Sequence, residues 1–432
     1  FDVLPKIHRG EKLMSTRISR PSHPASLLAN DAEPDLPGKG ITIFFFVYLT
    51  IEYMRPQDSL PILGIIRPAL ICLVVLAFFS ITKLRSEVFT DRSIRLFIAF
   101  VCVCWLGIFY ATNNFWAFQY SLTMTMHLLA AVIPMCLIVR TEERLWNLLA
   151  FWVSVHCYLA IYGLLHGGRG PGSFLADEND LALALNVALP YAYFLRNVSG
   201  ISRFYRMLLL GATLLFAAGV VATMSRGGFV GLAVTTLLLI YFSKQRIRNL
   251  FTVLLFGVIF FALVPSEYKE EVQSINDTED ATRTGRLHQW GVGWDMYLDN
   301  PVFGVGTGNY PWRVSEYEIR SANYDPSAAL HGGRAAHSMY FTLFPELGSV
   351  GTLIFFLILW EIWKKLRGVI SPTVGATAIQ GDTLTQAAAR ATLVSLAAFL
   401  VTGVFISVLY YPPFWYAIGI SYVISYVATK EK

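Results

Sequence analysis

The residues best suited to chemistry in this sequence are a histidine, a few arginines and their polar neighbours, all near the ends of apolar segments. His337 stands where a long polar stretch returns to an apolar segment, and an imidazole with a pKa near about 6.5 can act there as a general base. A histidine in such a place is more often a structural hydrogen-bonding group, so both interpretations remain open. Ser338 and Glu346 are candidates for supporting roles, and Pro345 predicts a kink that leaves His337 on a short helix of its own.

Two arginines have the surroundings of an anion site. Arg226 lies in the short Ser-Arg-Gly-Gly turn 225–228, whose glycines leave backbone N–H groups exposed at a helix start, which favours an anion. An arginine that only extends toward water from a helix end is an equally good interpretation. Arg286 lies in the Thr-Gly-Arg stretch 284–286 of a net acidic segment, so an anion site there needs a few aimed arginines.

A glycine-rich segment at 167–174 supplies a third arginine, Arg169. Its glycines allow a ligand to approach the backbone closely, and a guanidinium fits phosphate oxygens. The segment ends in acidic and amide residues, of which Asn179 is a candidate for a supporting role. The alternative is an ordinary turn followed by a helix that Asn179 or Asp180 caps.

The elements that position these residues follow from composition. The chain has 432 residues, of which 55% are hydrophobic and 15% charged, whereas soluble domains carry about a quarter of charged residues. The apolar residues gather in runs of about twenty, the length that crosses about 30 Å of hydrocarbon, so the sequence predicts an all-α polytopic membrane protein. The net charge of +5 is spread over short loops and indicates no nucleic-acid partner. The five cysteines all lie in apolar runs and predict packing residues, not disulfides.

The apolar runs predict about twelve transmembrane helices. They lie at 41–54, 62–82, 93–112, 121–139, 143–165, 180–195, 204–223, 227–242, 249–265, 338–363, 387–409 and 413–428. Basic residues gather in every second loop, and positive loops stay cytoplasmic. We therefore expect a multi-pass inner-membrane protein with both termini in the cytoplasm. The expected regions are a polar cytoplasmic tail at 1–40, helices one to nine at 41–265, a periplasmic loop domain at 266–337 and helices ten to twelve at 338–432. Since Phe1 is no initiator, Met14 is the expected natural start, with residues 1–13 added ahead of it.

The periplasmic loop domain is expected to carry function, because loops of its length inside a compact protein usually do. Apolar and aromatic residues recur there with helical spacing, at Leu287, Trp290, Trp294 and Leu298. They predict a short amphipathic helix at 283–298 whose aromatic face suits the bilayer interface. The active site is then expected on the periplasmic side.

Other polar residues give bland predictions. An acidic cluster in the loop is expected to be solvated and not to bind a metal: Asp277, Glu279 and Asp280. Three polar residues lie inside apolar runs, where buried polar groups are candidates for function: Arg67, His127 and His156. For the two histidines we expect packing hydrogen bonds between helices. We expect no metal and no other cofactor.

Four stretches together resemble the O-antigen ligase and polymerase superfamily, whose multi-span enzymes handle undecaprenyl-diphosphate-linked glycans. In order they are Gly172-Ser173-Phe174 with Asn179; Ser225-Arg226-Gly227; Thr284-Gly285-Arg286 with Asn300-Pro301-Val302-Phe303-Gly304-Val305-Gly306; and His337-Ser338 with Glu346-Leu347-Gly348. The resemblance covers about residues 170–350. It implies a metal-independent, inverting glycosyl transfer with His337 at the position of the essential histidine. Arg226 and Arg286 match arginines that engage the donor diphosphate, and Ser338 departs from the asparagine that many relatives carry.

Within the superfamily we favour the lipopolysaccharide O-antigen ligase, which joins the lipid-linked glycan to a lipid A–core acceptor. Membrane lipids are then further partners. The alternatives are an O-antigen or exopolysaccharide chain polymerase and a ligase that glycosylates protein, and the stretch 52–57 resembles ligase-like proteins of exopolysaccharide clusters. A secondary transporter is disfavoured because no second half of the chain mirrors the first. A scaffold without catalysis leaves Arg226, Arg286 and His337 on one face unexplained.

Overall fold

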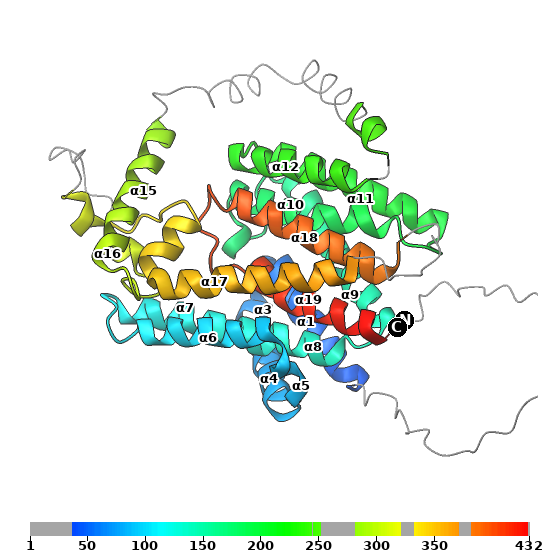
Figure 1. Cartoon of the computed structure of the whole chain (residues 1–432), viewed down its shortest axis with the longest axis horizontal. Helices are drawn as coiled ribbons and strands as arrows, with labels where there is room; N and C mark the ends of the chain where they lie inside the picture. Colours follow the sequence, from blue (N-terminus) through cyan, green and yellow to red (C-terminus); the bar gives the residue numbers. More distant parts are fainter. Residues whose placement is uncertain (1–36, 244, 252–280, 321–331, 371–381, 431–432) are drawn as a thin grey trace, which may run out of the picture.

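The computed structural model describes residues 37–243, 245–251, 281–320, 332–370 and 382–430, which form a bundle of helices (Figure 1). The helices are α1 (Lys39–Met54), α2 (Pro56–Ser59), α3 (Pro61–Ile66), α4 (Pro68–Thr82), α5 (Ser86–Thr90), α6 (Arg92–Gly107), α7 (Asn114–Met126), the π-helical η1 (His127–Val132), α8 (Ile133–Ile138), α9 (Glu142–Leu165), the 3-10 turn η2 (Ser173–Leu175), α10 (Glu178–Leu195), α11 (Arg203–Ala222), α12 (Arg226–Phe242), α15 (Ala281–Asp299), α16 (Tyr310–Glu318), α17 (Tyr340–Ile370), α18 (Leu384–Thr402) and α19 (Pro412–Lys430). Within these ranges, an isolated parallel β-bridge joins Val198 and Asp382. The predicted all-α class is confirmed.

Six helices in the described ranges are long and apolar enough to cross a membrane. They span Ile62–Thr82, Asn114–Ile138, Glu142–Leu165, Arg203–Ala222, Tyr340–Ile370 and Leu384–Thr402, and α12 is a shorter apolar helix. The chain is thus consistent with a multi-pass membrane protein, while the count of twelve stays a prediction. Most of the predicted run 249–265 lies outside the described residues, as do the acids at 277–280 and much of the predicted loop domain.

The run predicted at 62–82 contains a break. Arg67 joins α3 to α4 with a φ of 51°, because the ring of Pro68 disfavours the right-handed helical conformation in the residue before it. Its side chain is exposed, so Arg67 is not a buried charge.

The buried helix α10 lies at the centre of one half of the bundle and packs against α9, α11, α12 and α18 (Figure 1). Glycines in α12 make this packing close. A Cβ at Gly228 would lie 2.5 Å from the Cβ of Ala182 in α10, and a Cβ at Gly231 would lie 2.2 Å from Thr402 Oγ1 in α18. The first residues of α10 and α12 therefore lie at the same end of the bundle as the last residues of α18.

The region around α17 corrects one prediction. The helix is kinked at Gly348, which has a φ of 59°, so a short segment carrying Pro345 precedes the long one, as expected. That segment begins at Tyr340, however, and His337 precedes it in a left-handed conformation with a φ of 49°. The prediction that His337 lies on the short helix is wrong, since the Met339 N–H donates to Gly403 O at the end of α18, 2.7 Å away, and not to a helical carbonyl.

The helix predicted at 283–298 is confirmed as α15. One face packs inward through Val292 and Met296, which are buried. On the other side Leu287, Trp294 and Leu298 are about half exposed, at 53%, 46% and 56%. This uncovered apolar side fits the predicted contact with the bilayer interface.

His127 makes the predicted hydrogen bond to another element, whereas His156 bonds within its own helix, so the prediction of a bond between helices is wrong for His156. His127 Nε2 lies 3.1 Å from Tyr410 O, which precedes α19, and His156 Nδ1 lies 2.8 Å from Trp152 O of its own helix. The five cysteines are free thiols.

Candidate active site

The turn that carries Arg226 is held by a chain of side-chain hydrogen bonds. Ser225 caps α12: its Oγ accepts from the Gly228 N–H at 2.9 Å and donates to Asn179 Oδ1 at 2.7 Å. Asn179 Nδ2 in turn donates to Asp177 Oδ1 at 2.7 Å. The start of α10 is thereby tied to the start of α12, and Arg226 is fixed as the first residue of α12.

Asp177 is the cap of α10, and it accepts from the Asn179 N–H at 2.8 Å. The prediction that Asn179 or Asp180 caps this helix is wrong, because the cap lies two residues before Asn179. Asn179 is inside the first turn, and its side chain is turned toward Ser225. The sequence suggested a supporting role for Asn179 but did not show that it links two helices, because its partner Ser225 lies 46 positions further along the chain.

His337 and Arg226 approach the same end of α18. The residue after α18, Gly403, accepts the Met339 N–H, two residues from His337. Two positions further on, Phe405 lies so close to Gly227 that an added Cβ there would be 3.0 Å from it. The turns on both sides of this end are strained, because Met224 and His337 are non-glycine residues with positive φ, at 53° and 49°. Such conformations cost about 1–3 kcal/mol each and gather at functional sites.

Charged residues from other elements of the bundle act on the imidazole of His337. Partial burial lowers the pKa of its imidazole, the positive charges of Arg286 and Arg334 lower it further, and the carboxylate of Asp177 opposes them. Arg286 comes from α15 and Asp177 from the cap of α10. The imidazole is therefore neutral at neutral pH and able to accept a proton.

Trp290 fixes the backbone that leads into His337. Its indole N–H donates to Ala336 O at 3.1 Å, and its ring stacks on Phe341 with centroids 5.3 Å apart. Arg286 is one helical turn earlier on the same face of α15, so α15 presents both residues to this segment. The helical spacing of Trp290 was visible in the sequence, but its contact with the His337 segment was not.

Glu346 is buried, at 2% exposure, and is saturated with donors. It accepts from the N–H groups of Gly308 at 2.7 Å and Tyr310 at 3.0 Å, and from the hydroxyl of Tyr410 at 2.5 Å. These contacts fasten the start of α16 to the kink of α17. The geometry makes Glu346 a positioning residue.

Two stretches of the resemblance pack directly on one another. The segment 301–306 lies along the kink 345–350, with Val305 N–H donating to Pro345 O at 2.8 Å and Ser349 N–H donating to Pro301 O at 2.8 Å. A Cβ at Gly304 would lie 2.4 Å from the carbonyl carbon of Glu346, so the backbones meet at a distance that only glycine permits.

The other predicted residues differ in their surroundings. Arg169 is exposed and forms an ion pair with Glu178, Nε to Oε2 3.3 Å. Ser338 is buried at 1% exposure, and its hydroxyl finds no partner among the described residues. Within the described ranges, no group of histidine, cysteine and acidic residues has the arrangement of a metal site.

Comparison with known proteins gives two matches. Residues 211–356 match the family model described as O-antigen ligase, a segment that contains Arg226, Arg286, His337, Ser338 and Glu346 and leaves out Arg169 and Asn179. The chain is also 23% identical over 258 residues to the teichuronic acid biosynthesis protein TuaE of Bacillus subtilis (strain 168), which covers 52% of this chain. The chain spans about half, 51%, of that relative.

Proposed function

We propose a function on the premise, supported by both matches, that the chain resembles the O-antigen ligase and polymerase superfamily. The protein is an inverting, metal-independent glycosyltransferase at the periplasmic face of a bacterial inner membrane. It transfers an undecaprenyl-diphosphate-linked O-antigen glycan to a lipid A–core oligosaccharide. The match to the O-antigen ligase family by itself supports an enzyme of polyprenyl-linked glycan assembly in a membrane.

The observation that carries this proposal is the environment of His337, a neutral imidazole beside the cation of Arg286 and at the α18 end where Arg226 begins α12. In the proposed step, the imidazole takes the proton of the acceptor hydroxyl while that oxygen attacks the anomeric carbon. The bond from that carbon to the diphosphate oxygen breaks, and the electron pair leaves with the polyprenyl diphosphate. A single displacement from the opposite side inverts the anomeric centre.

The arginines supply the charge that the leaving group needs. One further negative charge develops on the diphosphate oxygens as the bond breaks, and guanidinium groups aimed at these oxygens stabilise the transition state. Arg226 and Arg286 have this role in the proposal. Arg169, held by Glu178, is a further contact that becomes available when that exposed ion pair opens. The neighbours Ser338, Glu346 and Asn179 orient this machinery.

The test uses purified protein with undecaprenyl-diphosphate glycan and lipid A–core, in the presence of EDTA. We expect a modified lipid A–core, formed without divalent cations and lost in His337→Ala. Transfer that survives His337→Ala, or that stops in EDTA and returns with a divalent cation, contradicts the mechanism.

A chain polymerase is the second candidate, because the relative from Bacillus subtilis is named for the biosynthesis of teichuronic acid. The chemistry at His337 is the same, and only the acceptor differs. A lengthened lipid-diphosphate glycan in the same assay identifies a polymerase, and a modified lipid A–core identifies the ligase.

A further inference from the structure

A carboxyl group next to the candidate active site is only half bonded. Asp180, in the first turn of α10, is buried at 8% exposure. Its Oδ2 accepts from the Tyr411 hydroxyl at 3.5 Å, whereas hydrogen bonds between oxygens are usually about 2.5–3.0 Å long. Its Oδ1 is buried and has no partner among the described residues. Because a buried acid that lacks a donor is destabilising, this oxygen is a candidate for a ligand contact.

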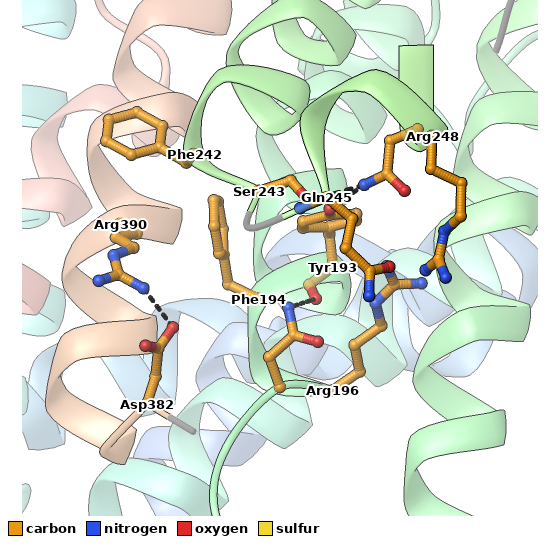
Figure 2. Close-up of a pocket in the computed structure, with 11 residues that line it drawn as sticks. Tyr193, Phe194, Arg196, Phe242, Ser243, Gln245, Arg248, Asp382 and Arg390 are labelled. Atoms are coloured by element: carbon orange, nitrogen blue, oxygen red, sulfur yellow. Dashed lines mark hydrogen bonds and ion pairs between the residues drawn. The ribbon is translucent and has the colours of Figure 1, made fainter. Parts of the chain in front are cut away.

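Other acids of low exposure have their partners. Glu346 accepts from three donors. The rest have basic partners: Asp91 with Lys365, Glu318 with His288, Glu361 with Arg92 and Lys364, and Asp382 with Arg390. Figure 2 shows the last of these pairs beside a cavity at the other end of α10. Among the described acids, only Asp180 has a buried oxygen without a partner.

Asp180 lies beside the residues of the proposed reaction. Asn179, the residue before it, is bonded to the cap of the helix that Arg226 begins. Asp177, three residues earlier, acts on the imidazole of His337. A ligand that Arg226 and His337 hold therefore has this turn of α10 as its neighbour.

Aromatic rings accompany the carboxyl group. Tyr411, which bonds to Asp180, packs against Phe174 with ring centroids 5.4 Å apart, and Phe174 packs against Tyr53, also at 5.4 Å. Tyr411 and Phe174 are both partly exposed, so this cluster extends to the surface. Ligand sites combine aromatic walls with a few polar groups that fix orientation. A sugar fits this combination, because its C–H groups pack on aromatic rings and its hydroxyls donate to a carboxylate.

We propose that Asp180 binds the sugar that is attached to the diphosphate of the donor. Oδ1 accepts a hydrogen bond from a hydroxyl of that sugar, and the ring of Tyr411 packs against it. The long bond from Tyr411 to Oδ2 is weak, so a small rotation of this ring opens the carboxyl to the sugar. The proposal rests on the proposed function, since it takes the lipid-linked glycan as substrate. It adds a residue that selects the sugar, because a polar group built to meet a hydroxyl rejects a ligand that lacks it.

The test compares how the full-length protein binds two lipids, undecaprenyl-diphosphate glycan isolated from the cells that make the protein and undecaprenyl diphosphate without sugar. Dissociation constants are measured by native mass spectrometry. Asp180→Leu removes the acceptor, so we expect its affinity for the glycan-bearing lipid to fall about 10–100-fold, with little change for the bare lipid. Asp180→Asn retains a carbonyl oxygen, and its loss is only about three- to tenfold, because hydrogen bonds to a charged group are stronger.

The matched control is Asp382→Leu, which removes another acid of low exposure, outside the site, and leaves the ratio of the two affinities unchanged. Equal weakening of both lipids by Asp180→Leu means general damage to the fold. An unchanged ratio with a lowered unfolding midpoint means that Oδ1 bonds to water only, and either result overturns the proposal. If Asp180→Leu does not fold, the same criteria apply to Asp180→Asn.

The outcome for the unaltered protein separates this proposal from the proposed function. Binding of neither lipid contradicts the proposed function, and the Asp180 contact with it. Binding of both lipids without preference for the glycan contradicts the Asp180 contact alone.

Discussion

The imidazole of His337 is surrounded by charges of both signs, and each neighbour has a separable effect on its pKa. Arg286 and Arg334 disfavour the imidazolium, whereas Asp177 favours it. A base with a lowered pKa remains neutral, and so active, at a pH below the usual value of about 6.5. The arrangement keeps the base available in mildly acidic solution.

Removal of the base is the first prediction. His337→Gln keeps a polar side chain of similar size and removes proton transfer, so kcat falls by about 10²–10⁴-fold. The measurement is the rate of glycan transfer at saturating donor. An unchanged thermal unfolding midpoint shows that the loss is chemical, and a rate within a few-fold of the unaltered enzyme contradicts the assignment.

The second prediction concerns pH. Arg334→Gln removes a positive neighbour, which raises the pKa of His337 and moves the acid limb of kcat/KM to higher pH. Asp177→Asn removes the opposing negative charge and retains a capping side chain, so the limb moves to lower pH. The pH profiles of the two variants are therefore displaced in opposite directions. A displacement in the same direction excludes His337 as the titrating base.

At the same scale, residue types were more predictable than their partners. His337, Arg226 and Arg286 stand out in the sequence because each follows an apolar boundary or a glycine. The influence of Asp177 and Arg334 on His337 and the bond from Ser225 to Asn179 join residues far apart in sequence, and nothing in local spacing encodes them.

Individual helices are aimed by a few side-chain contacts at their ends. Ser225 both caps α12 and bonds to Asn179, so one hydroxyl sets the start of α12 and its distance from α10. Trp290 likewise joins α15 to the backbone before His337. These contacts set the positions of Arg226 on α12 and Arg286 on α15.

The third prediction follows from Ser225. Ser225→Ala loses the cap, at a cost of about 1 kcal/mol in stability, and frees Asn179. Because Arg226 then loses its fixed position, we expect the activation free energy that kcat/KM reports to rise by more than this loss of stability. Ser225→Thr retains the hydroxyl and restores activity. Thermal unfolding and transfer kinetics of the two variants provide the measurement, and equal activity of Ser225→Ala and the unaltered enzyme rules out the positioning role.

The fourth prediction concerns Trp290. Trp290→Phe retains a ring to stack on Phe341 and loses the N–H bond to Ala336 O, at a cost of about 0.5–1.5 kcal/mol in stability. We expect kcat to fall while KM for the donor changes little, because the segment of His337 is displaced and the arginines are not. A rise in KM alone points instead to a role of α15 in donor binding.

Helix boundaries were predicted well where the helical period of apolar residues was strong. They were predicted poorly where the backbone bonds to a distant segment instead of within its own helix. The spacing of aromatic residues predicted α15 closely. The start of α17 was misplaced because Met339 bonds to Gly403, and the kink falls at Gly348, where segment 301–306 takes up the free backbone groups. Only the fold brings these partners together.

At the scale of the whole molecule, the candidate active site lies at the end of the bundle where α10 and α12 begin and α18 ends. The order of basic loops in the sequence predicts that this end faces the periplasm and the other end the cytoplasm. The apolar runs of the sequence do not fix the number of membrane crossings, because a run may form a helix long enough to cross a bilayer, such as α9, or a shorter one, such as α12.

The fifth prediction tests this orientation. In a variant without native cysteines, His166→Cys lies in the exposed turn after α9 and Arg203→Cys lies in the exposed first turn of α11. We expect a membrane-impermeant maleimide to label the first in spheroplasts and the second only after the membrane is opened. Reversed labelling inverts the topology and removes the proposed active site from the periplasm.

The uncovered apolar side of α15, formed by Leu287, Trp294 and Leu298, affects how substrate arrives. In the proposed reaction, contact of this side with lipid places the end of α15 that carries Arg286 level with the diphosphate of a lipid-borne donor. The proposed donor then reaches the enzyme by lateral diffusion, without leaving the leaflet. Its encounter rate is set by how many donors share the membrane area, and an aqueous concentration does not describe it.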